Sequence, residues 1–418
     1  MTKVFVTGLG FISSIGNSTA EVLDSLLHLR TGIEPYPPFS PENIPIKLAG
    51  TIKGFDTGSM DSEDWTFPGI YRPGRNLLRN LSPHGLYCFC AMTQAIENSG
   101  LTKDDISSER TGLYTASVGS VSNQRYHLNR LRDLGPEKLS PKAVICSAPG
   151  TLNFNFVAHL GIKGSSCGFI SACASSGHAL GFAWDEIVTG RQDIMLVVSG
   201  EDGDFETILP FAAMRALATG SDPKEAVCPF DKRRSGFVAA GGGVAMILES
   251  EASVKRRGVR PLAQMLSWAQ TSDGYSPVLP EPEGKGVARS MKMAIERAGL
   301  TPQDIDYLNA HAPSTVAGDL AEIKAIKTVF GTGARIKVSS TKSLTGHGLS
   351  MSSIIEAAIS VLSVDTGYCP GTAHLKDPDP EAEGINLLFE TEKTDPQYVL
   401  SNSSGFGGSN VSLLFGKP

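Results

Sequence analysis

The stretch GFISACASSGHALG, residues 168–181, places a cysteine among small residues. Phe169 and Ile170 indicate the end of a strand, and residues 174–188 have the composition of a helix. Cys173 would then lie at a strand-to-helix turn, where the positive end of the helix dipole lowers the pKa of a thiol. The small neighbours leave room for a substrate. The pattern predicts a nucleophile, and the alternative is a small buried hydrophobic residue.

Two further segments carry histidines beside residues that could tune them. In NAHAPSTVAGDLAE, His311 ends a predicted strand ahead of a helix. In SSTKSLTGHGLSMSSIIEA, Lys342 and His347 lie five residues apart in a loop, and Glu356 follows on a helix. A fourth segment, SNSSGFGGSN, is a glycine-rich turn after a strand, which exposes backbone N–H groups. A lone histidine is more often structural, but four such segments in one chain favour an enzyme site.

Other patterns in the chain are weaker. GLG at residues 8–10 lacks the third glycine and the acidic residue of a dinucleotide-binding fingerprint. The S-x-x-K sequence at residues 339–342 matches one motif of penicillin-recognising enzymes, but no S-D-N or K-T-G follows it. The cysteine and histidine spacings, such as CFC at residues 88–90, do not match zinc-ligand spacing. We therefore expect no metal.

An internal repeat indicates what positions these segments. Residues 95–106, AIENSGLTKDDI, and residues 294–305, AIERAGLTPQDI, agree at eight of twelve positions, at an offset of 294 − 95 = 199. Each copy resembles a helix end, a glycine stop at Gly100 or Gly299, and a threonine that can cap a short turn. A strand-like run follows each copy. The repeat predicts a duplicated α/β half-domain.

Short apolar runs alternate with amphipathic stretches along the chain, which indicates a layered α/β fold. We expect a proline-rich surface loop over residues 29–75 and a charged joining segment over residues 249–261. The predicted strands are 3–7, 194–199, 244–248 and 399–401, and the predicted helices are 86–98, 174–189, 287–298 and 351–363.

Composition narrows the class of protein. With 418 residues the chain exceeds the ~250–300 residues of one core, so two domains are expected. Hydrophobic residues make up 41% and charged residues 19%, which excludes a disordered chain. The net charge of −6 without a basic block argues against nucleic acid. No apolar run reaches the ~18 residues of a membrane span, and no signal peptide is recognisable. Seven scattered cysteines favour reduced thiols and a cytoplasmic protein.

At this point the sequence resembles the β-ketoacyl-acyl-carrier-protein synthases, condensing enzymes of the thiolase-like superfamily, and within them the type II elongating kind. The resemblance runs nearly end to end and keeps the motif order. The matching segments are VFVTGLGFISSIG, ISACASS, CPFDKRRSGFV, NAHAPST, SSTKSLTGH and SGFGGSN. It implies a thiolase-like five-layer αβαβα fold of two duplicated halves. The predicted halves are residues 1–250, with the nucleophile, and 251–418, with the histidines.

Carried over by position, the resemblance implies that Cys173 accepts the acyl group and that His311 and His347 are the catalytic histidines. Lys342 would sit behind them with Glu356 as its charge partner.

Phe406 would be the gating residue. Its backbone N–H and that of Cys173 would form the oxyanion hole. The implied reaction is a decarboxylative Claisen condensation of malonyl-acyl carrier protein with the cysteine-bound acyl chain. No metal or diffusible cofactor is implied, because the phosphopantetheine arm arrives with the acyl carrier protein.

Several positions depart from the family pattern. Ser235 replaces an aspartate, Gly241 a glutamate, and Ser404 the first phenylalanine of F-G-F, while Ala312–Pro313 replaces Gly-Thr. These departures favour a specialised fatty-acid, polyene or polyketide pathway over a housekeeping elongase. The alternatives are a chain-initiating or acyl-transferring enzyme, and a non-catalytic chain-length-factor-type partner of a ketosynthase. Such partners usually lack the cysteine that this chain retains.

Partner surfaces can also be predicted. The segment YRPGRNLLRN spaces Arg72, Arg75 and Arg79 by three and four residues, so a helix there would place all three on one face. That face would dock an acidic acyl carrier protein, and the alternative is a solvated helix. We expect the floor of the acyl pocket near residues 116–123 and across a dimer interface. The dimer would be a homodimer or a heterodimer with a similar subunit.

Overall fold

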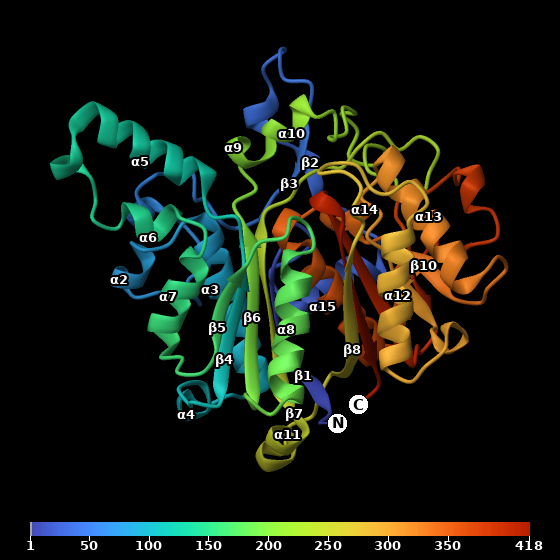
Figure 1. Cartoon of the computed structure of the whole chain (residues 1–418). Coiled ribbons are helices and arrows are strands. Elements are labelled where there is room, and N and C mark those ends of the chain that lie inside the picture. The colour runs from blue at the N-terminus through green and yellow to red at the C-terminus, as the bar shows by residue number, and fades with distance from the viewer. Residues whose placement is uncertain (1) are drawn as a thin grey trace.

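The computed structural model describes residues 2–418 and shows an α/β fold of two similar halves (Figure 1). In the first half five strands follow the order β5-β4-β6-β7-β1, in which β4 runs parallel to β5 and β6 while β7 is antiparallel to β6 and β1. Their bounds are β1 (Val4–Ile12), β4 (Thr111–Ala116), β5 (Ser166–Phe169), β6 (Ile194–Glu201) and β7 (Gly242–Ser250).

The second half repeats this arrangement strand for strand. Its order is β10-β9-β14-β15-β8, with β9 parallel to β10 and β14, and β15 antiparallel to β14 and β8. The bounds are β8 (Ala263–Ser272), β9 (Tyr307–Asn309), β10 (Lys337–Ser339), β14 (Tyr398–Gly405) and β15 (Ser409–Gly416). β12 (Asn386–Leu387) extends the outer edge, and β1 pairs with β8 to join the halves into one eleven-stranded sheet.

Helices complete the five layers of a thiolase-like fold. α8 (Ser175–Val188) and α15 (Ser352–Thr366) pack against each other between the two half-sheets. α3 (Pro83–Ser99) covers the outer face of the first half, and α12 (Lys285–Arg297) with α13 (Val316–Phe330) covers that of the second. The predicted fold class and the four predicted helices are confirmed.

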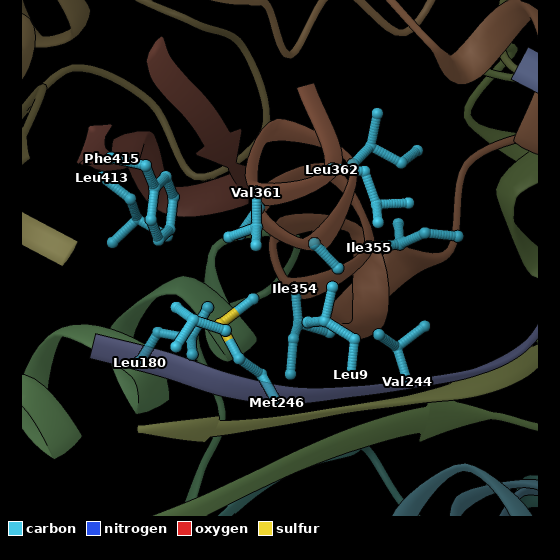
Figure 2. Close-up of a cluster of buried hydrophobic side chains, with 14 of the residues drawn as sticks. Leu9, Leu180, Val244, Met246, Ile354, Ile355, Val361, Leu362, Leu413 and Phe415 are labelled. Carbon is cyan, nitrogen blue, oxygen red and sulfur yellow. The ribbon is translucent and has the colours of Figure 1, made fainter. Parts of the chain in front are cut away.

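The main core lies around the two central helices. Ile354 and Ile355 at the start of α15 approach Leu9, Val244 and Met246 of the first half-sheet (Figure 2). On the other side of the helix lie Leu413 and Phe415 of β15, in the second half-sheet. All are less than 3% exposed. One continuous apolar core therefore spans both halves and holds the first turns of α8 and α15 at a fixed separation.

The repeated segment ends α3 in one half and α12 in the other. Gly100 and Gly299 both adopt left-handed backbone conformations, with φ of 65° and 73°. Each is followed by a capping box, Thr102 with Asp105 and Thr301 with Asp304. The predicted glycine stop and threonine cap are thus confirmed in both copies.

The rest of the chain forms short surface elements. Residues 29–75 are largely irregular, as expected, and α11 occupies most of the charged segment between the halves. The helices are α1 (Thr19–Leu27), α2 (Arg75–Leu78), α4 (Lys103–Ile106), α5 (Val121–Leu134), α6 (Ala143–Ser147), α7 (Thr151–Leu160), α9 (Phe205–Ile208), α10 (Pro210–Ala213), α11 (Glu251–Arg257) and α14 (Lys342–Thr345). The short strands are β2 (Ile33–Pro35), β3 (Leu48–Gly50), β11 (Tyr368–Cys369) and β13 (Glu392–Lys393).

One helical stretch, Leu349–Thr366, is long and apolar enough to cross a membrane. It contains α15, and 89% of it is buried inside the protein. It is therefore a core helix of the middle layer.

Candidate active site

Cys173 lies where β5 gives way to α8, as the sequence predicts. The preceding residue, Ala172, has a φ of 52°, a left-handed conformation that non-glycine residues adopt only under constraint. Ser175 supplies that constraint: its hydroxyl accepts a hydrogen bond from the Ser171 N–H at 2.7 Å and donates to the Ala172 carbonyl at 2.6 Å. The turn presents the thiol at the amino end of α8.

The glycine-rich turn between β14 and β15 packs directly against Cys173. A Cβ atom on Gly405 would lie 2.9 Å from the Cys173 backbone nitrogen, so only glycine fits there. The backbone N–H groups of Cys173 itself and of Phe406 lie close enough to the sulfur to lower the pKa of the thiol. The two N–H groups predicted for the oxyanion hole therefore converge on the nucleophile.

The two histidines reach the same point from the second half. His311 follows β9 and His347 follows α14, and both are nearly fully buried. The Cys173 sulfur and one ring nitrogen of each histidine lie within 4.8 Å of one another. The histidine rings meet edge to face with centroids 5.4 Å apart. The structure thus brings together three residues separated by up to 174 positions in sequence (347 − 173).

Hydrogen bonds fix which ring nitrogen of each histidine carries the proton. The Leu349 backbone N–H donates to His347 Nδ1 at 3.1 Å, and the Ser352 hydroxyl lies 2.7 Å from the same nitrogen. The Lys342 ammonium, which can only donate, lies 3.2 Å from His311 Nδ1. Because Nδ1 accepts in both rings, each neutral imidazole carries its proton on Nε2.

A buried ion pair stands behind His311. Lys342 pairs with Glu356 of α15, and its ammonium also donates to the His311 carbonyl oxygen at 2.6 Å. Both side chains of the pair are 1% exposed. The Ser403 hydroxyl donates to Glu356 at 3.3 Å. The charge partner predicted for Lys342 is therefore present, and the lysine is held where it contacts His311.

The electrostatics keep both histidines neutral. Burial places the pKa of His311 and of His347 well below the ordinary range, and the positive charge of Lys342 lowers both further. Protonation would also remove the Nδ1 lone pair that each ring uses to accept. Both rings are therefore neutral Nε2–H donors at physiological pH.

The thiol behaves differently from the sequence-based expectation. Burial raises the pKa of Cys173 to about 12, and Glu356 raises it as well, while Lys342 and the two backbone N–H groups lower it. The backbone N–H at the amino end of α8 does lower the pKa, but removal of the thiolate from water outweighs this contribution, so the net shift is upward. The resting nucleophile is therefore a thiol.

Sequence reasoning missed Glu322, although it lies within the His311 segment. Its carboxylate accepts from the backbone N–H groups of His311 at 2.9 Å and Ala312 at 2.6 Å. It also accepts from the Asn402 side chain at 2.7 Å. The available signal was an acidic residue among the apolar residues of the helix that directly follows the His311 loop. Glu322 fixes the backbone that carries His311.

A cavity of about 550 Å³ contains Cys173, His311 and His347, and its wall is mostly apolar. Phe406 stands in this wall with its ring 6.2 Å from that of Phe211. The departures Ser235, Pro313 and Ser404 also line the cavity, whereas Gly241 and Ala312 do not. Val118 and Val121, from the predicted pocket floor, contribute as well.

The three arginines do not share one helix face. α2 begins only at Arg75, so Arg72 lies in the preceding loop with Pro73 and Gly74. Arg75 and Arg79 both pair with Glu63, which lowers the pKa of that carboxyl. The predicted three-arginine helix face was therefore wrong, although all three side chains are exposed.

Two family models match the chain over most of its length. Residues 1–253 match the model of the N-terminal domain of β-ketoacyl synthases, and residues 262–376 match that of the C-terminal domain. The chain belongs to the β-ketoacyl synthase family. It is therefore an acyltransferase that forms carbon–carbon bonds, of the elongating kind.

Similar proteins cover its whole length. A 3-oxoacyl-[acyl-carrier-protein] synthase 1 of Haemophilus influenzae is 36% identical over 99% of both chains. A synthase 2 of Staphylococcus aureus strain N315 is 34% identical over 99% of this chain and 98% of the relative. The solved structure of a β-ketoacyl synthase from Burkholderia phymatum superposes with a TM-score of 0.91 at 28% identity, covering 100% of both chains. The ishigamide ketosynthase/chain length factor gives 0.88 at 26% identity, covering 100% of this chain and 99% of that one.

Proposed function

We propose that this β-ketoacyl synthase condenses malonyl-acyl carrier protein with an acyl chain held on Cys173. One observation carries the proposal: two neutral histidines, each fixed as an Nε2–H donor, flank a thiol at the amino end of a helix. That arrangement serves two successive steps. One needs a nucleophile with an oxyanion hole, and the other needs two hydrogen-bond donors to one carbonyl oxygen.

In the loading step the Cys173 sulfur attacks the thioester carbonyl of the acyl carrier. The carbonyl oxygen becomes negative and accepts hydrogen bonds from the N–H groups of Cys173 and Phe406, which already converge on the sulfur. The carrier thiolate leaves and takes up the proton that the Cys173 thiol gives up. The product is an acyl-cysteine thioester.

In the condensing step the malonyl thioester carbonyl lies between the Nε2–H groups of His311 and His347. Loss of CO₂ leaves the electron pair on the α-carbon, with the negative charge shared by the thioester oxygen that the two histidines stabilise. The α-carbon then attacks the acyl-cysteine carbonyl beside it, and the Cys173 thiolate leaves and takes up a proton from water to restore the resting thiol. Because Cys173 lies within 4.8 Å of both histidines, the reacting groups are already positioned.

Lys342 and Glu356 act as positioning residues in this scheme. Lys342 occupies the Nδ1 lone pair of His311 and holds the pKa of both histidines low. Glu356 balances the buried lysine, which could not otherwise remain charged away from water. The scheme needs no metal and no diffusible cofactor, because the pantetheine arm comes with the carrier protein.

The carrier partner we propose is an acidic acyl carrier protein that docks near Arg72, Arg75 and Arg79. These side chains are exposed on one surface segment, and the relatives named above are synthases of acyl-carrier-protein substrates. Glu63 neutralises part of the patch, so the docking surface is less basic than the sequence indicates. A carrier carboxylate would compete with Glu63 for the two arginines.

We further propose a homodimer joined through β5, in the cytoplasm. β5 is the outermost strand of the first half and three of its four residues are exposed, so it offers an unpaired edge for a second copy. Ile170 beside it is 60% exposed and Phe154 is 46% exposed. The second copy could instead be a similar chain-length-factor subunit.

The departures Ser235, Pro313 and Ser404 in the cavity wall support a specialised fatty-acid, polyene or polyketide pathway.

Intact-mass measurement tests the proposed function. The full chain is incubated with a panel of acyl-carrier thioesters and then with malonyl-acyl carrier protein. We expect a mass increase equal to one acyl group, its absence in Cys173→Ala, and release of a β-ketoacyl carrier after malonyl addition. An acyl adduct that persists at full level in Cys173→Ala would contradict the assignment.

A further inference from the structure

A buried carboxylate of the first half contacts the loop that carries His347 in the second half. Glu201 is the last residue of β6 and is fully buried. Its Oε1 accepts two hydrogen bonds from Ser350, one from the side-chain hydroxyl and one from the backbone N–H at 3.3 Å. Within residues 2–418 Ser350 is the only hydrogen-bond partner of Glu201, and Oε2 has none. Because burial of a carboxylate is costly, this single contact indicates a role beyond filling the core.

The turn that contains Ser350 also supplies the hydrogen bonds that hold the His347 ring. It is a 3₁₀ turn, Leu349–Met351, directly before α15. Leu349 has a φ of 50°, in the left-handed region that a leucine adopts only under constraint. The same residue donates its N–H to His347 Nδ1 at 3.1 Å, and the Ser352 hydroxyl lies 2.7 Å from that nitrogen. The state of the His347 ring therefore depends on a strained turn.

Ser350 is the residue through which this turn is attached to the first half. Its carbonyl oxygen accepts a hydrogen bond from the Ser176 hydroxyl of α8 at 2.7 Å. Its N–H and its hydroxyl both donate to Glu201. Ser176 therefore fixes the carbonyl side of Ser350, and Glu201 fixes the donor side. Among residues 2–418 no other side chain hydrogen-bonds Ser350.

We propose that Glu201 is a positioning residue for His347, a role that rests on the proposed function. By holding Ser350 it keeps Leu349 in the left-handed conformation. The Leu349 N–H and the Ser352 hydroxyl then both occupy His347 Nδ1. The proton of the neutral ring stays on Nε2, where the condensing step needs a donor. The first half thus contributes to enolate stabilisation through a residue that touches no substrate.

This role requires an acceptor atom at Oε1 and not a negative charge. Burial raises the pKa of Glu201 to about 7, although the hydrogen bond from the Ser350 hydroxyl lowers it. Glutamine presents a similar oxygen to Ser350 and has the same length, so it should replace Glu201. Leucine is close in size but has no acceptor, so it should not.

Glu201→Leu and Glu201→Gln form the first test. Loading of Cys173 from an acyl-carrier thioester is followed by intact mass, and condensation of the preloaded enzyme with malonyl-acyl carrier protein is followed in single turnovers. Glu201→Leu should condense about tenfold more slowly, the effect of losing a hydrogen bond to a carboxylate, and should load at the wild-type rate. Glu201→Gln should restore condensation. Equal losses in loading and condensation, or a Gln variant as slow as the Leu variant, would overturn the proposal.

Ser350→Ala tests the same contact if Glu201→Leu fails to fold. It removes one of the two hydrogen bonds to Glu201, so condensation should fall about threefold while loading is unchanged. Ser363→Ala is the matched control, because Ser363 is a buried serine of α15 whose hydroxyl donates within its own helix, to the Ile359 carbonyl oxygen at 3.1 Å. It should leave both rates unchanged. Condensation by Ser350→Ala at the wild-type rate would overturn the proposal.

Nitrogen NMR of protein with isotope-labelled histidine measures the ring without any substrate. The His347 signals are assigned by their loss in His347→Ala. The wild type should show a protonated Nε2 and an unprotonated Nδ1. In Glu201→Leu part of the population should carry the proton on Nδ1, and in Glu201→Gln it should not. A lowered melting temperature of Glu201→Leu with unchanged His347 signals would show that Glu201 serves only the fold, and would overturn the proposal.

The proposed function and the role of Glu201 fail in different ways. If the wild type neither loads an acyl group nor condenses it with malonyl-acyl carrier protein, the proposed function fails, and the role of Glu201 in condensation fails with it. If the wild type does both, and Glu201→Leu changes neither condensation nor the His347 signals, the role of Glu201 alone fails.

Discussion

The two halves share one strand order, yet they contribute different chemistry at equivalent places. Of the five sheet strands in each half, the third in chain order leads into a central helix. In the first half this strand is β5, and the chain runs from it through Cys173 into α8. In the second half the third strand, β10, leads through Lys342 and His347 into the central helix α15. The duplication therefore supplies two similar turns that face each other, and the residues placed in them divide the reaction between acyl transfer and enolate stabilisation.

A second contrast lies in the connection between the last two strands of each half, which are β6 and β7 in the first half and β14 and β15 in the second. In the second half β14 and β15 are joined by three residues, Phe406–Gly408, which place the Phe406 backbone N–H at Cys173. In the first half β6 and β7 are separated by residues 202–241, which include α9 and α10 and cover the cavity. The same strand order thus carries a three-residue turn at the nucleophile in the second half and a 40-residue insertion, residues 202–241, that lines the cavity in the first half.

The halves are joined at the nucleophile itself. The Ser353 hydroxyl at the start of α15 donates to the Cys173 carbonyl oxygen at 2.9 Å. Ser176 of α8 donates to the Ser350 carbonyl at 2.7 Å and accepts from the Ile354 N–H at 3.0 Å. These bonds fix the amino ends of the two central helices relative to each other. A division of labour is possible only because the two turns keep a constant separation.

The largest effect is expected from Cys173→Ala, which removes the only chemistry assigned to the first half. Acyl loading should fall to zero because no other group takes the place of the thiol at the turn. The melting temperature should stay within a few degrees, since the change removes a single sulfur atom and no hydrogen bond of the turn. Intact mass and thermal unfolding measure both results. An acyl group loaded on the Cys173→Ala variant would contradict the assignment of acyl transfer to the first half.

His311→Ala and His347→Ala test the second half separately. Each should permit loading of Cys173 but lower condensation on the order of 10²–10³-fold, as when one oxyanion-hole donor is lost. Single-turnover assays with a preloaded acyl-enzyme and malonyl-acyl carrier protein measure this directly. A variant that condenses at the wild-type rate would show that its histidine is not a donor to the enolate.

Lys342→Met should shift the pH dependence of condensation. In the wild type Lys342 helps to hold the pKa of both histidines well below the ordinary range, so their neutral form persists into acid. Without the lysine those pKa values rise, and the acid limb of the rate profile should move to higher pH. Since this change leaves Glu356 buried and unpaired, Lys342→Met/Glu356→Gln is the matched variant, and it should show the same shift. An unmoved acid limb in both would remove Lys342 from this role.

The smallest effect is expected at the surface. Reversing the charge of Arg75 and Arg79 should raise the KM for carrier-bound substrate several-fold, because complementary charge mainly speeds encounter. A small pantetheine thioester should be turned over as before, since it has no protein surface to dock. The effect should shrink as salt is added. Equal loss with both substrates would indicate a folding defect and contradict the docking surface.

The sequence predicted the residues of the site better than their physical state. Cys173, His311, His347 and Lys342 stand in contiguous motifs, and their positions follow from strand ends that the pattern of apolar residues marks. The pKa of Cys173 could not be predicted, because it depends on burial by segments far away in the chain. The role of Glu322 depends likewise on contacts across the fold.

The surface was predicted least well. The spacing of Arg72, Arg75 and Arg79 is compatible with a helix, but Pro73 and Gly74 delay its start until Arg75. Glu63, which pairs with two of these arginines, lies 12 residues before Arg75 in a single 3₁₀ turn, Ser62–Asp64. Spacing alone does not show such a partner, since exposed charges select neighbours only once the loops are in place.

Decarboxylation measured without acyl transfer tests the division of labour most directly. Release of labelled CO₂ from malonyl-acyl carrier protein is followed with Cys173→Ala and with Cys173→Ala/His311→Ala. The account predicts that the single variant still releases CO₂, because enolate stabilisation belongs to the second half, and that the double variant loses it by on the order of 10²–10³-fold. Loss of CO₂ release in the single variant, or equal release by both, would contradict the account.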